Sequence, residues 1–257
     1  MSLTKFVKRG AVMVRQYSRR ISIIERHIRG QGLEIGALQD PQVVPRGTRV
    51  RYVDIVSNED AARVHPRKRQ KDLVPVDIVD DGQTLATVAN ESQDFVISNH
   101  FLEHCQDPLR ALENMLRVVR VGGVVYLSIP DKRRTFDRNR PTTTAEHLIE
   151  DYRRGPQSSM RGHYEEAVRC NERITDPDQV ATRVDERIER GDQIHFHCWD
   201  DRALLATLLA ARDELEFPFE IEEFARNEAE LVCVLSRQAP ATDRADSTTA
   251  APVTANC

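Results

Sequence analysis

The sequence is short of several residue types that would mark a specialised class of protein. Only 5% of its 257 residues are aromatic, which leaves few side chains for stacking on nucleic-acid bases. Its five cysteines are odd in number and include no C-x-x-C pair, so neither a disulfide framework nor a cysteine zinc site is expected. The apolar stretch 203–211 is interrupted by Thr207 and is far shorter than the roughly 20 residues of a membrane span. We expect no integral membrane association and a reducing, cytoplasmic compartment.

What the sequence does contain fits a globular protein with a sizeable core. Apolar residues make up 40% and charged residues 30%, and the formal net charge is −4. The apolar fraction is too high for a disordered chain of such modest charge. A mildly acidic chain also lacks the positive field of a dedicated nucleic-acid binder, so no nucleic-acid partner is expected.

The body of the chain alternates between strand and helix patterns. A helix is predicted from the N-cap Asp107 and Pro108 to the pair Gly122-Gly123, and a second over about 201–216. Strands are predicted over 32–36, 49–56, 73–79, 94–98, 124–129, 219–224 and 231–235. The alternation predicts an α/β fold with a doubly wound parallel sheet. The last two strands must be antiparallel, because their connection is too short for a crossover.

The chain divides into five segments by composition. Residues 1–30 are rich in lysine and arginine and are interpreted as a helix packed on the first strand, with a transit peptide or membrane-surface helix as the alternatives. Residues 31–130 form the first half of the sheet, and 200–237 supply the last helix and the closing hairpin. Between them, the charged residues 131–199 are expected to be an inserted helical lid over the substrate. Residues 238–257 lack aromatic residues and are predicted to be a disordered tail.

Polar residues recur where the predicted parallel strands end. Glu34 and Gly36 end the first strand, and Asp54 ends the second, at the distance where a carboxylate accepts the hydroxyls of a ribose. Asp80-Asp81-Gly82 follow the third strand and Asn99 ends the fourth. Because parallel strands end at the same edge of a sheet, these residues indicate one ligand site there. The G-x-G-x-x-G motif of nicotinamide dinucleotide enzymes is missing.

These pieces resemble the class I S-adenosylmethionine-dependent methyltransferases, in particular their small-molecule branch. The resemblance covers residues 30–130 and lies in Asp81-Gly-Gln-Thr-Leu85, Asp94-Phe-Val-Ile97, Phe101-Leu-Glu-His104 and Leu116-Arg-Val-Val-Arg-Val-Gly-Gly123. It implies a Rossmann-like sheet of seven strands with an antiparallel last strand. It also implies S-adenosyl-L-methionine as the cofactor.

The resemblance implies a role for each strand end. Glu34, Ile35, Gly36 and Ala37 would hold the methionine end of the cofactor, and Asn99 would form the floor of the methyl site. Asp54 and Ile55 would take the ribose, and Asp80, Asp81 and Gly82 the adenine. One departure is notable, because Leu38 stands where the family has a second glycine. Residues 38–47 are also too short for the usual first crossover helix.

The insertion offers candidate groups for the acceptor. Residues 131–140 carry five cations, which predict either a clamp for an anionic acceptor or a salt-bridged loop. In His195-Phe196-His197, strand alternation would place both histidines on one face, aimed at the crevice. We predict His197 as the general base, with a smaller role for His195 and with His100 as a wall of the pocket. A metal shared with His147 or His163 and a purely structural pair are the alternatives, and no bound metal is predicted.

The sequence therefore predicts a methyltransferase acting on a small-molecule or glycan-type acceptor. Methyl transfer from a sulfonium needs alignment more than strong acid–base groups, which suits a chain with no catalytic triad. A nucleic-acid methyltransferase and a non-catalytic Rossmann-like binding module are the alternatives. The sequence leaves the methylated atom, the acceptor and the oligomeric state open.

Overall fold

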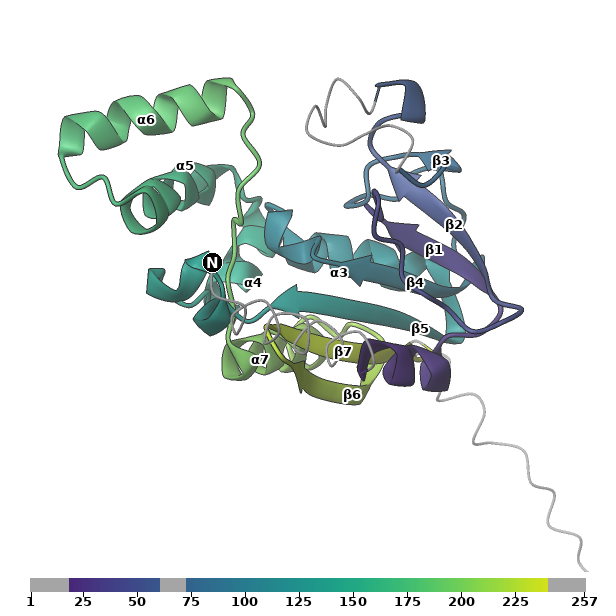
Figure 1. The fold of residues 1–257 in the computed structure, drawn as a ribbon. Helices are drawn as coiled ribbons and strands as arrows, with labels where there is room; N and C mark the ends of the chain where they lie inside the picture. Colours follow the sequence, from purple (N-terminus) through teal and green to yellow (C-terminus); the bar gives the residue numbers. More distant parts are fainter. Residues whose placement is uncertain (1–18, 61–72, 240–257) are drawn as a thin grey trace, which may run out of the picture.

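The computed structural model describes residues 19–60 and 73–239, and a seven-stranded sheet forms its centre (Figure 1). The strand order is β3-β2-β1-β4-β5-β7-β6. The strands are β1 (Gln31–Ile35), β2 (Arg49–Asp54), β3 (Ile78–Val79), β4 (Gln93–Asn99), β5 (Val119–Pro130), β6 (Phe219–Asn227) and β7 (Glu230–Arg237). Strands β1 to β5 pair in parallel, whereas β7 is antiparallel to both β5 and β6. The predicted doubly wound fold with an antiparallel last strand is confirmed.

The helices lie mostly in the second half of the chain. They are α3 (Pro108–Val118), α4 (Ala145–Arg154), α5 (Gln157–Ala167), α6 (Pro177–Glu189) and α7 (Asp201–Asp213). Short helical turns are η2 (Leu102–His104), η3 (Lys132–Arg134), η4 (Phe136–Asn139) and the π-helical η5 (Val168–Glu172). No helix connects β1 to β2, which is the outcome that the short crossover predicts. Within the described residues, no helix has the length and apolar character needed to cross a membrane.

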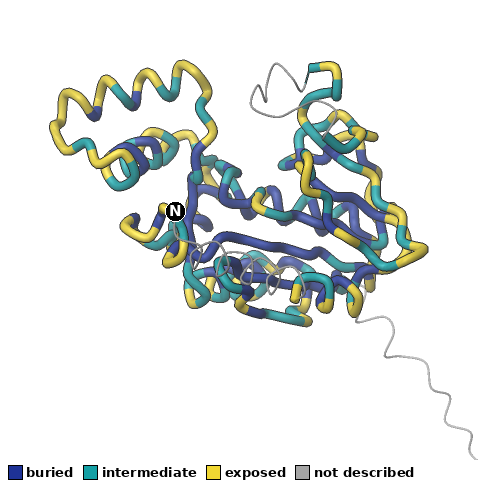
Figure 2. Tube along the Cα trace, in the orientation of Figure 1, coloured by how far each residue is buried: buried dark blue, intermediate teal, exposed yellow. Residues whose placement is uncertain are grey.

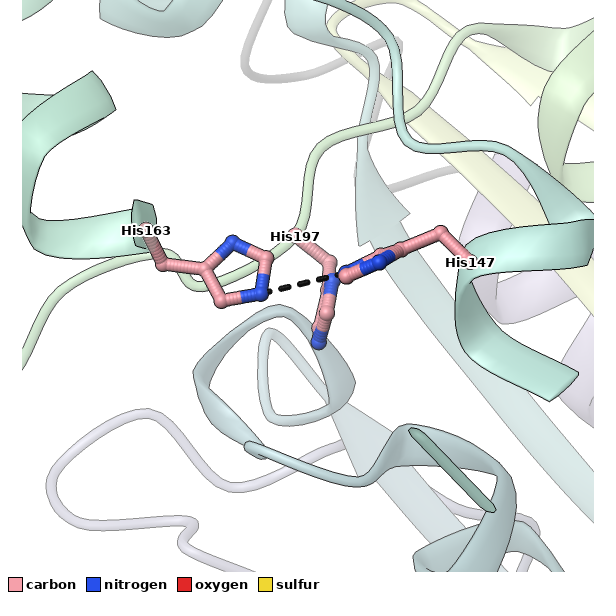
Figure 3. Close-up of side chains that lie close together, drawn as sticks. All are labelled: His147, His163 and His197. Atoms are coloured by element: carbon pink, nitrogen blue, oxygen red, sulfur yellow. Dashed lines mark hydrogen bonds between the residues drawn. The ribbon is translucent and has the colours of Figure 1, made fainter. Parts of the chain in front are cut away.

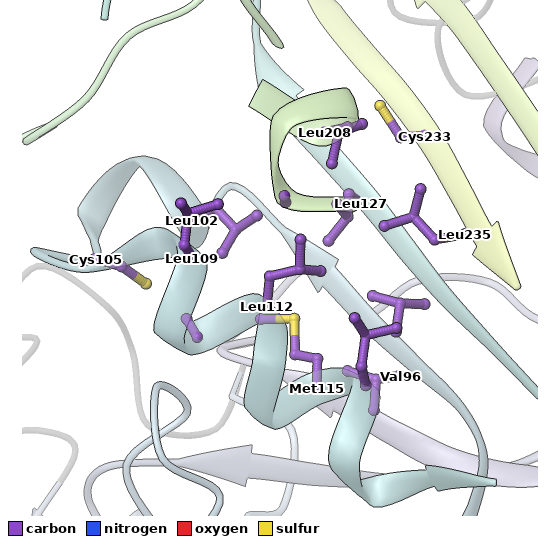
Figure 4. Close-up of a cluster of buried hydrophobic side chains, with 14 of the residues drawn as sticks. Val96, Leu102, Cys105, Leu109, Leu112, Met115, Leu127, Leu208, Cys233 and Leu235 are labelled. Carbon is purple, nitrogen blue, oxygen red and sulfur yellow. The ribbon is translucent and has the colours of Figure 1, made fainter. Parts of the chain in front are cut away.

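Helix α3 begins and ends for reasons that are visible in the sequence. The Asp107 carboxylate accepts a hydrogen bond from the backbone N–H of Arg110, and Pro108 occupies the first turn, where it needs no N–H partner. Leu109, Leu112 and Met115 then face β4 and β5 in the main core (Figure 4). The helix ends at Val118 and β5 begins at once with Val119, several residues before the predicted stop at Gly122-Gly123.

The opposite face of the sheet is covered by helical residues 19–27. Ile23, Ile24 and Ile28 are buried there against side chains of the central strands, among them Phe95 and Tyr126. The N-terminal helix therefore packs on β4, β5 and β7, and the prediction that it packs on the first strand was wrong. The remainder of the basic segment, residues 1–18, and residues 240–257 of the predicted tail lie outside the described residues.

The third strand is much shorter than the predicted range of 73–79. Only Ile78 and Val79 pair with β2, at the edge of the sheet. The preceding residues bind Asn58 instead, whose side-chain amide donates to the carbonyl of Val74 and whose oxygen accepts from the N–H of Val76. Pro75 between them has no N–H for a sheet hydrogen bond.

The predicted helical insertion after the fifth strand is confirmed. Helices α4, α5 and α6 lie between β5 and α7, and α5 and α6 extend away from the sheet (Figure 1). They share a small core of their own, formed by residues such as Tyr164, Val168, Val184 and Phe196. Most of α6 is exposed beyond that core (Figure 2).

Candidate active site

The residues expected to bind the cofactor meet at one edge of the sheet. Glu34 is next to last in β1, Asp54 ends β2, Asp80 directly follows β3 and Asn99 ends β4. These four strands are parallel neighbours, so their ends lie side by side. The structure therefore brings the predicted polar residues to one edge.

Glu34 is the buried centre of this edge. Its side chain is 1% exposed, and both carboxylate oxygens lie 3.0 Å from the backbone N–H of Gln42, which donates to them. Asn99 Nδ2 donates to Glu34 Oε1 at 3.3 Å. Burial raises the pKa of Glu34 to about 7, although the hydrogen bonds from Gln42 and Asn99 act against it. A cation placed beside this carboxyl would favour its ionised form.

The first turn is open at Gly36 and closed at Leu38. Gly36 has a φ of +65°, and a Cβ built on it would meet nothing within 4 Å, so a ligand can approach the backbone there. Leu38 also has a positive φ, 52°, which is unfavourable for a residue with a side chain. The N–H of Val74 donates to the carbonyl of Leu38 at 2.7 Å. Between this turn and Asp54 a cavity of only about 10 Å³ is left, room for about one water molecule.

The other acidic residues at this edge differ in how many hydrogen bonds they already accept within the protein. Asp54 is half-buried and accepts one hydrogen bond of 3.3 Å, from the N–H of Val56, while Ile55 is exposed. Asp80 accepts from both the N–H and the hydroxyl of Thr87, and these bonds lower its pKa although burial acts to raise it. Asp54 therefore has more acceptor capacity left for a ligand than Asp80.

Gly82 is required by close packing. A Cβ at this position would lie 2.4 Å from Ile35 Cγ2 and 2.9 Å from the Phe101 ring. The adjacent Asp81 turns the chain, since its Oδ1 accepts from the N–H of Gln83. The Asp81-Gly82 turn thus packs directly over the end of β1. By residue type and order, the edge fits an S-adenosylmethionine molecule, although the cavity at Leu38 and Val74 is too small for its adenosine.

His100 lies beside this edge, between two buried carboxylates. Its Nε2 donates to Glu230 Oε1 at 2.6 Å, and its Nδ1 lies 3.4 Å from Glu103 Oε1. Burial acts to lower the pKa of His100, but the two carboxylates outweigh it and raise the pKa to about 9. Arg20 completes the network with a bidentate contact to Glu230. His100 is therefore an imidazolium at neutral pH and no base for an attacking hydroxyl.

Sequence reasoning missed Glu230 and Arg20, and it quoted Glu103 only as part of the motif 101–104. Glu230 is 130 residues from His100 and 210 residues from Arg20 in the sequence. Only the antiparallel pairing of β7 with β5 brings them together, opposite Pro130. No local motif could have indicated this contact.

His195 pairs with a buried aspartate. Its Nδ1 donates to Asp137 Oδ2 at 2.6 Å, which leaves Nε2 as the acceptor of the neutral ring. Asp137 is 1% exposed and also accepts from Arg140. Burial acts to raise the pKa of Asp137, but His195 and Arg140 lower it overall, so the carboxylate is ionised. Asp137 is a second residue that sequence reasoning did not single out.

A cavity of about 450 Å³ opens beside this pair. It is lined by His195 together with His104, Phe136, Ala167, Asn171, Glu172, Arg183, Arg187, Gln193 and Ile194. The ring of His104 lies edge-on to His195 at 4.7 Å. His104 belongs to the turn η2 that follows β4, whereas the other lining residues belong to the insertion.

His197 lies in a different cluster and is fully buried. Its Nε2 donates to the carbonyl of Gln106 at 3.2 Å, and its ring packs near His163 and His147 (Figure 3). Burial and the neighbouring histidines hold its pKa well below the usual range. The prediction that His195 and His197 both aim into an open crevice was wrong, because the segment is not a regular strand and turns between them.

Two of the five cations in residues 131–140 have ion-pair partners, and a third is buried. Arg133 bridges Asp131 and Asp201, and Arg140 is buried between Asp137 and Glu166. Lys132 is buried, at 7% exposed. Arg134 and Arg138 are exposed and make no ion pair within the described part of the chain. Only these two remain available for an anionic acceptor.

Comparisons with known proteins bear on the first half of the chain. Residues 30–127 match the family model described as a methyltransferase domain. These residues contain Glu34, Gly36, Asp54, Asp81 and Asn99, so the match and the polar edge coincide. No curated protein matches the chain.

Several solved structures show a distant similarity to the chain. One from Rhodobacter sphaeroides, titled as a zinc-dependent alcohol dehydrogenase, is 17% identical with a TM-score of 0.49, over 86% of this chain and 90% of its own. A methyltransferase titled as S-adenosylmethionine-dependent, from Thermotoga maritima, is 15% identical with a TM-score of 0.48, over 92% and 96%. Another with such a title, from Methanosarcina mazei, is 16% identical with a TM-score of 0.45, over 84% and 97%. Likenesses this distant carry no argument about activity.

Proposed function

Because residues 30–127 match the model of a methyltransferase domain, we propose that this protein is a class I S-adenosylmethionine-dependent methyltransferase and that it methylates a small-molecule or glycan-type acceptor that carries negative charge. The observation that carries the proposal is the polar edge on parallel strands, centred on the hydrogen bond between Asn99 and Glu34. Ligands of open α/β sheets bind at this edge.

The cofactor would lie along the strand ends in the order of the sheet. Gly36 would let the methionine end approach the backbone, and Asp54 would accept the ribose hydroxyls. The whole proposed set is Glu34, Ile35, Gly36, Ala37, Asp54, Ile55, Asp80, Asp81, Gly82 and Asn99. When bound, S-adenosyl-L-methionine supplies an electrophilic methyl group. The small cavity at Leu38 requires that the contact with Val74 open as the adenosine enters.

Positive charge beside β5 supports an anionic acceptor. A cavity of about 550 Å³ is lined by Arg19, Asp131, Arg133, Arg134, Arg226 and Glu228. Arg133 and Arg226 form ion pairs with Asp201, whereas Arg134 is exposed and without an ion pair among the described residues. A carboxylate or phosphate on the acceptor would supply the missing partner.

The acceptor proton would go to His195 rather than to His197. Asp137 fixes His195 with Nε2 as the acceptor nitrogen, the arrangement that orients a general base. His195 lines a cavity that is formed by the insertion and His104, while His197 is fully buried. Asp137 would stabilise the imidazolium that forms when His195 takes a hydroxyl proton.

Calorimetry and methyl transfer together test the proposal. We expect S-adenosyl-L-methionine to bind with one site per chain, and labelled methyl transfer to appear in a panel of sugar phosphates and acidic glycans. Binding without transfer to any small acceptor, but with transfer to RNA or DNA, would overturn the acceptor class. Absence of cofactor binding would overturn the cofactor site and favour a non-catalytic module.

A further inference from the structure

Three histidines from separate elements converge at the base of the insertion. His147 is in the first turn of α4, His163 is in α5, and His197 is on the segment that returns to the core (Figure 3). One ring nitrogen from each lies within 4.8 Å of the other two. The Nε2 atoms of His147 and His163 are 3.2 Å apart. This cluster is separate from the sheet edge and from the pair of His195 and Asp137.

The hydrogen bond of the His197 ring leaves its second nitrogen, Nδ1, without a partner among the described residues. A carbonyl oxygen can only accept, so the contact with Gln106 places the ring proton of His197 on Nε2. Nδ1 then carries a lone pair, is fully buried, and has no hydrogen-bond partner within the described residues. Buried acceptors are almost always satisfied, so this nitrogen needs an explanation. Among metal-binding histidines, one ring nitrogen commonly donates to a carbonyl while the other binds the metal.

We infer that His147, His163 and His197 bind a divalent transition-metal ion, with zinc the best fit. Zinc–nitrogen bonds of 2.0–2.1 Å in a tetrahedral site place ligand nitrogens about 3.3 Å apart, close to the spacing of His147 and His163. The carboxylate of Asp151, one turn further along α4, lies 3.4 Å from His147 Nε2. It is outside the set of ligand atoms that lie within 4.8 Å of one another, so it would become the fourth ligand only by moving toward His163 and His197. Asp151 is itself oriented by the hydroxyl of Ser159. Three imidazoles and a carboxylate are ligands that suit zinc.

A second cluster, Glu103, His104 and His195, meets the same distance criterion but is explained without a metal. His195 is bonded to Asp137, and His104 Nδ1 donates to the carbonyl of Ile194. Both carboxylate oxygens of Glu103 are also buried without a hydrogen-bond partner among the described residues, but the imidazolium of His100 lies 3.4 Å from Oε1 and balances the charge. No comparable partner accounts for Nδ1 of His197.

A metal at the three histidines would tie the insertion to the core. It would join α4 and α5 to the return segment, next to the small core of the insertion. The site is therefore structural and does not depend on cofactor binding. This inference replaces the expectation from sequence that no metal is bound.

The test uses the full chain without a histidine tag, so that no added histidines bind metal. We expect about one zinc per chain by elemental analysis, loss of it to a strong chelator, and a lower melting temperature that zinc restores. Cobalt loaded into the stripped protein should give the visible bands of a tetrahedral site. His147→Gln, at the more exposed ligand, should reduce metal affinity at least tenfold, whereas the control His27→Gln should not.

Two outcomes would overturn the inference. One is a wild-type protein that, after stripping with a chelator, takes up no stoichiometric zinc, cobalt or nickel and melts at the same temperature with and without these metals. This result does not depend on whether any variant folds. The other is stoichiometric metal that survives His147→Gln and His163→Gln but is lost in His104→Gln. That result would assign the metal to the cluster of Glu103, His104 and His195.

Discussion

Asn99 donates a hydrogen bond of 3.3 Å to the carboxyl of Glu34, and this bond joins the ends of β4 and β1 at the proposed cofactor edge. The carboxyl is buried, and its pKa is raised to about 7 because burial outweighs the hydrogen bonds from Gln42 and Asn99. An acidic group with this pKa links the stability of the site to pH.

The first prediction concerns that link. A carboxyl whose pKa is higher in the folded state than in the unfolded state stabilises the fold fully below pH 4.5 and loses this contribution as the pH rises through about 7. Glu34→Gln removes the titration. The free energy of unfolding of the variant, relative to wild type, should therefore increase by on the order of 3 kcal/mol between pH 4.5 and 7.5.

Urea unfolding across this pH range measures the difference. Glu189→Gln, at the exposed end of α6, is the matched control and should follow wild type. Parallel curves for Glu34→Gln and wild type would show that Glu34 titrates like an ordinary carboxyl.

The second prediction concerns the ribose contact. Asp54→Ala removes the carboxylate at the end of β2 and leaves two hydroxyls of the cofactor without a protein partner. We expect cofactor affinity to fall by about 1–3 kcal/mol, or roughly 5- to 150-fold in Kd. Calorimetry with Asp40→Ala, an exposed aspartate of the first loop, provides the control. Unchanged affinity in Asp54→Ala would contradict the ribose assignment.

The third prediction concerns the strained first turn. Leu38 holds a φ of 52°, a conformation that glycine adopts without strain. Leu38→Gly should change the free energy of unfolding by less than about 1 kcal/mol, because relief of strain offsets the entropy that glycine gains in the unfolded chain. Cofactor binding should become tighter, since the side chain next to Asp54 is removed. Weaker binding would mean that Leu38 contacts the cofactor.

Much of the fold could be predicted because its signals are local. Asp107 and Pro108 start α3, and the short connection between the last two strands requires an antiparallel pair. The length of the third strand could not be predicted, because the side chain of Asn58 donates to the carbonyl of Val74 and accepts from the N–H of Val76, in a stretch whose sequence is typical of a strand. The position of the N-terminal helix on the central strands was also invisible, since the sequence does not show which face of the sheet is uncovered.

The candidate site was predictable in part for the same reason. Strand ends reveal Glu34, Asp54 and Asn99, because each lies in a short local pattern. The partners of the histidines were not predictable, since Asp137 is 58 residues from His195 in the sequence and Glu230 is 130 from His100. Alternation assigned His195 and His197 to one face, but an irregular backbone separates them into two clusters.

The fourth prediction distinguishes the cations of residues 131–140 that would bind the acceptor from those that stabilise the fold. The double variant Arg134→Glu and Arg138→Glu should raise KM for an anionic acceptor at least tenfold with little change in melting temperature or cofactor affinity, because both side chains are exposed and without ion pairs among the described residues. Arg140→Ala should instead destabilise the fold by about 3 kcal/mol, because it leaves a buried carboxylate short of a partner. If the KM of the double variant is unchanged, Arg134 and Arg138 lie in a solvated loop and do not bind the acceptor.

The last prediction concerns the proposed general base. His195→Ala should lower kcat about 10²-fold with the fold intact, a typical loss when a base is removed. Asp137→Asn should also lower kcat, because an amide has no negative charge to stabilise the imidazolium and its NH2 group can donate to Nδ1, which reverses the tautomer of His195. His197→Ala should mainly lower the melting temperature, since its side chain is fully buried and away from the cavity of His195.

Turnover per folded molecule distinguishes these outcomes, with His27→Ala as a control at a histidine on the opposite face of the sheet. A large loss of kcat in His197→Ala at an unchanged melting temperature, with His195→Ala fully active, would reverse the assignment. His197 would then be the general base, and the buried cluster of histidines would have to open during turnover. Loss of activity in neither variant would mean that the acceptor atom needs no base, as expected for a nucleophile that is already deprotonated.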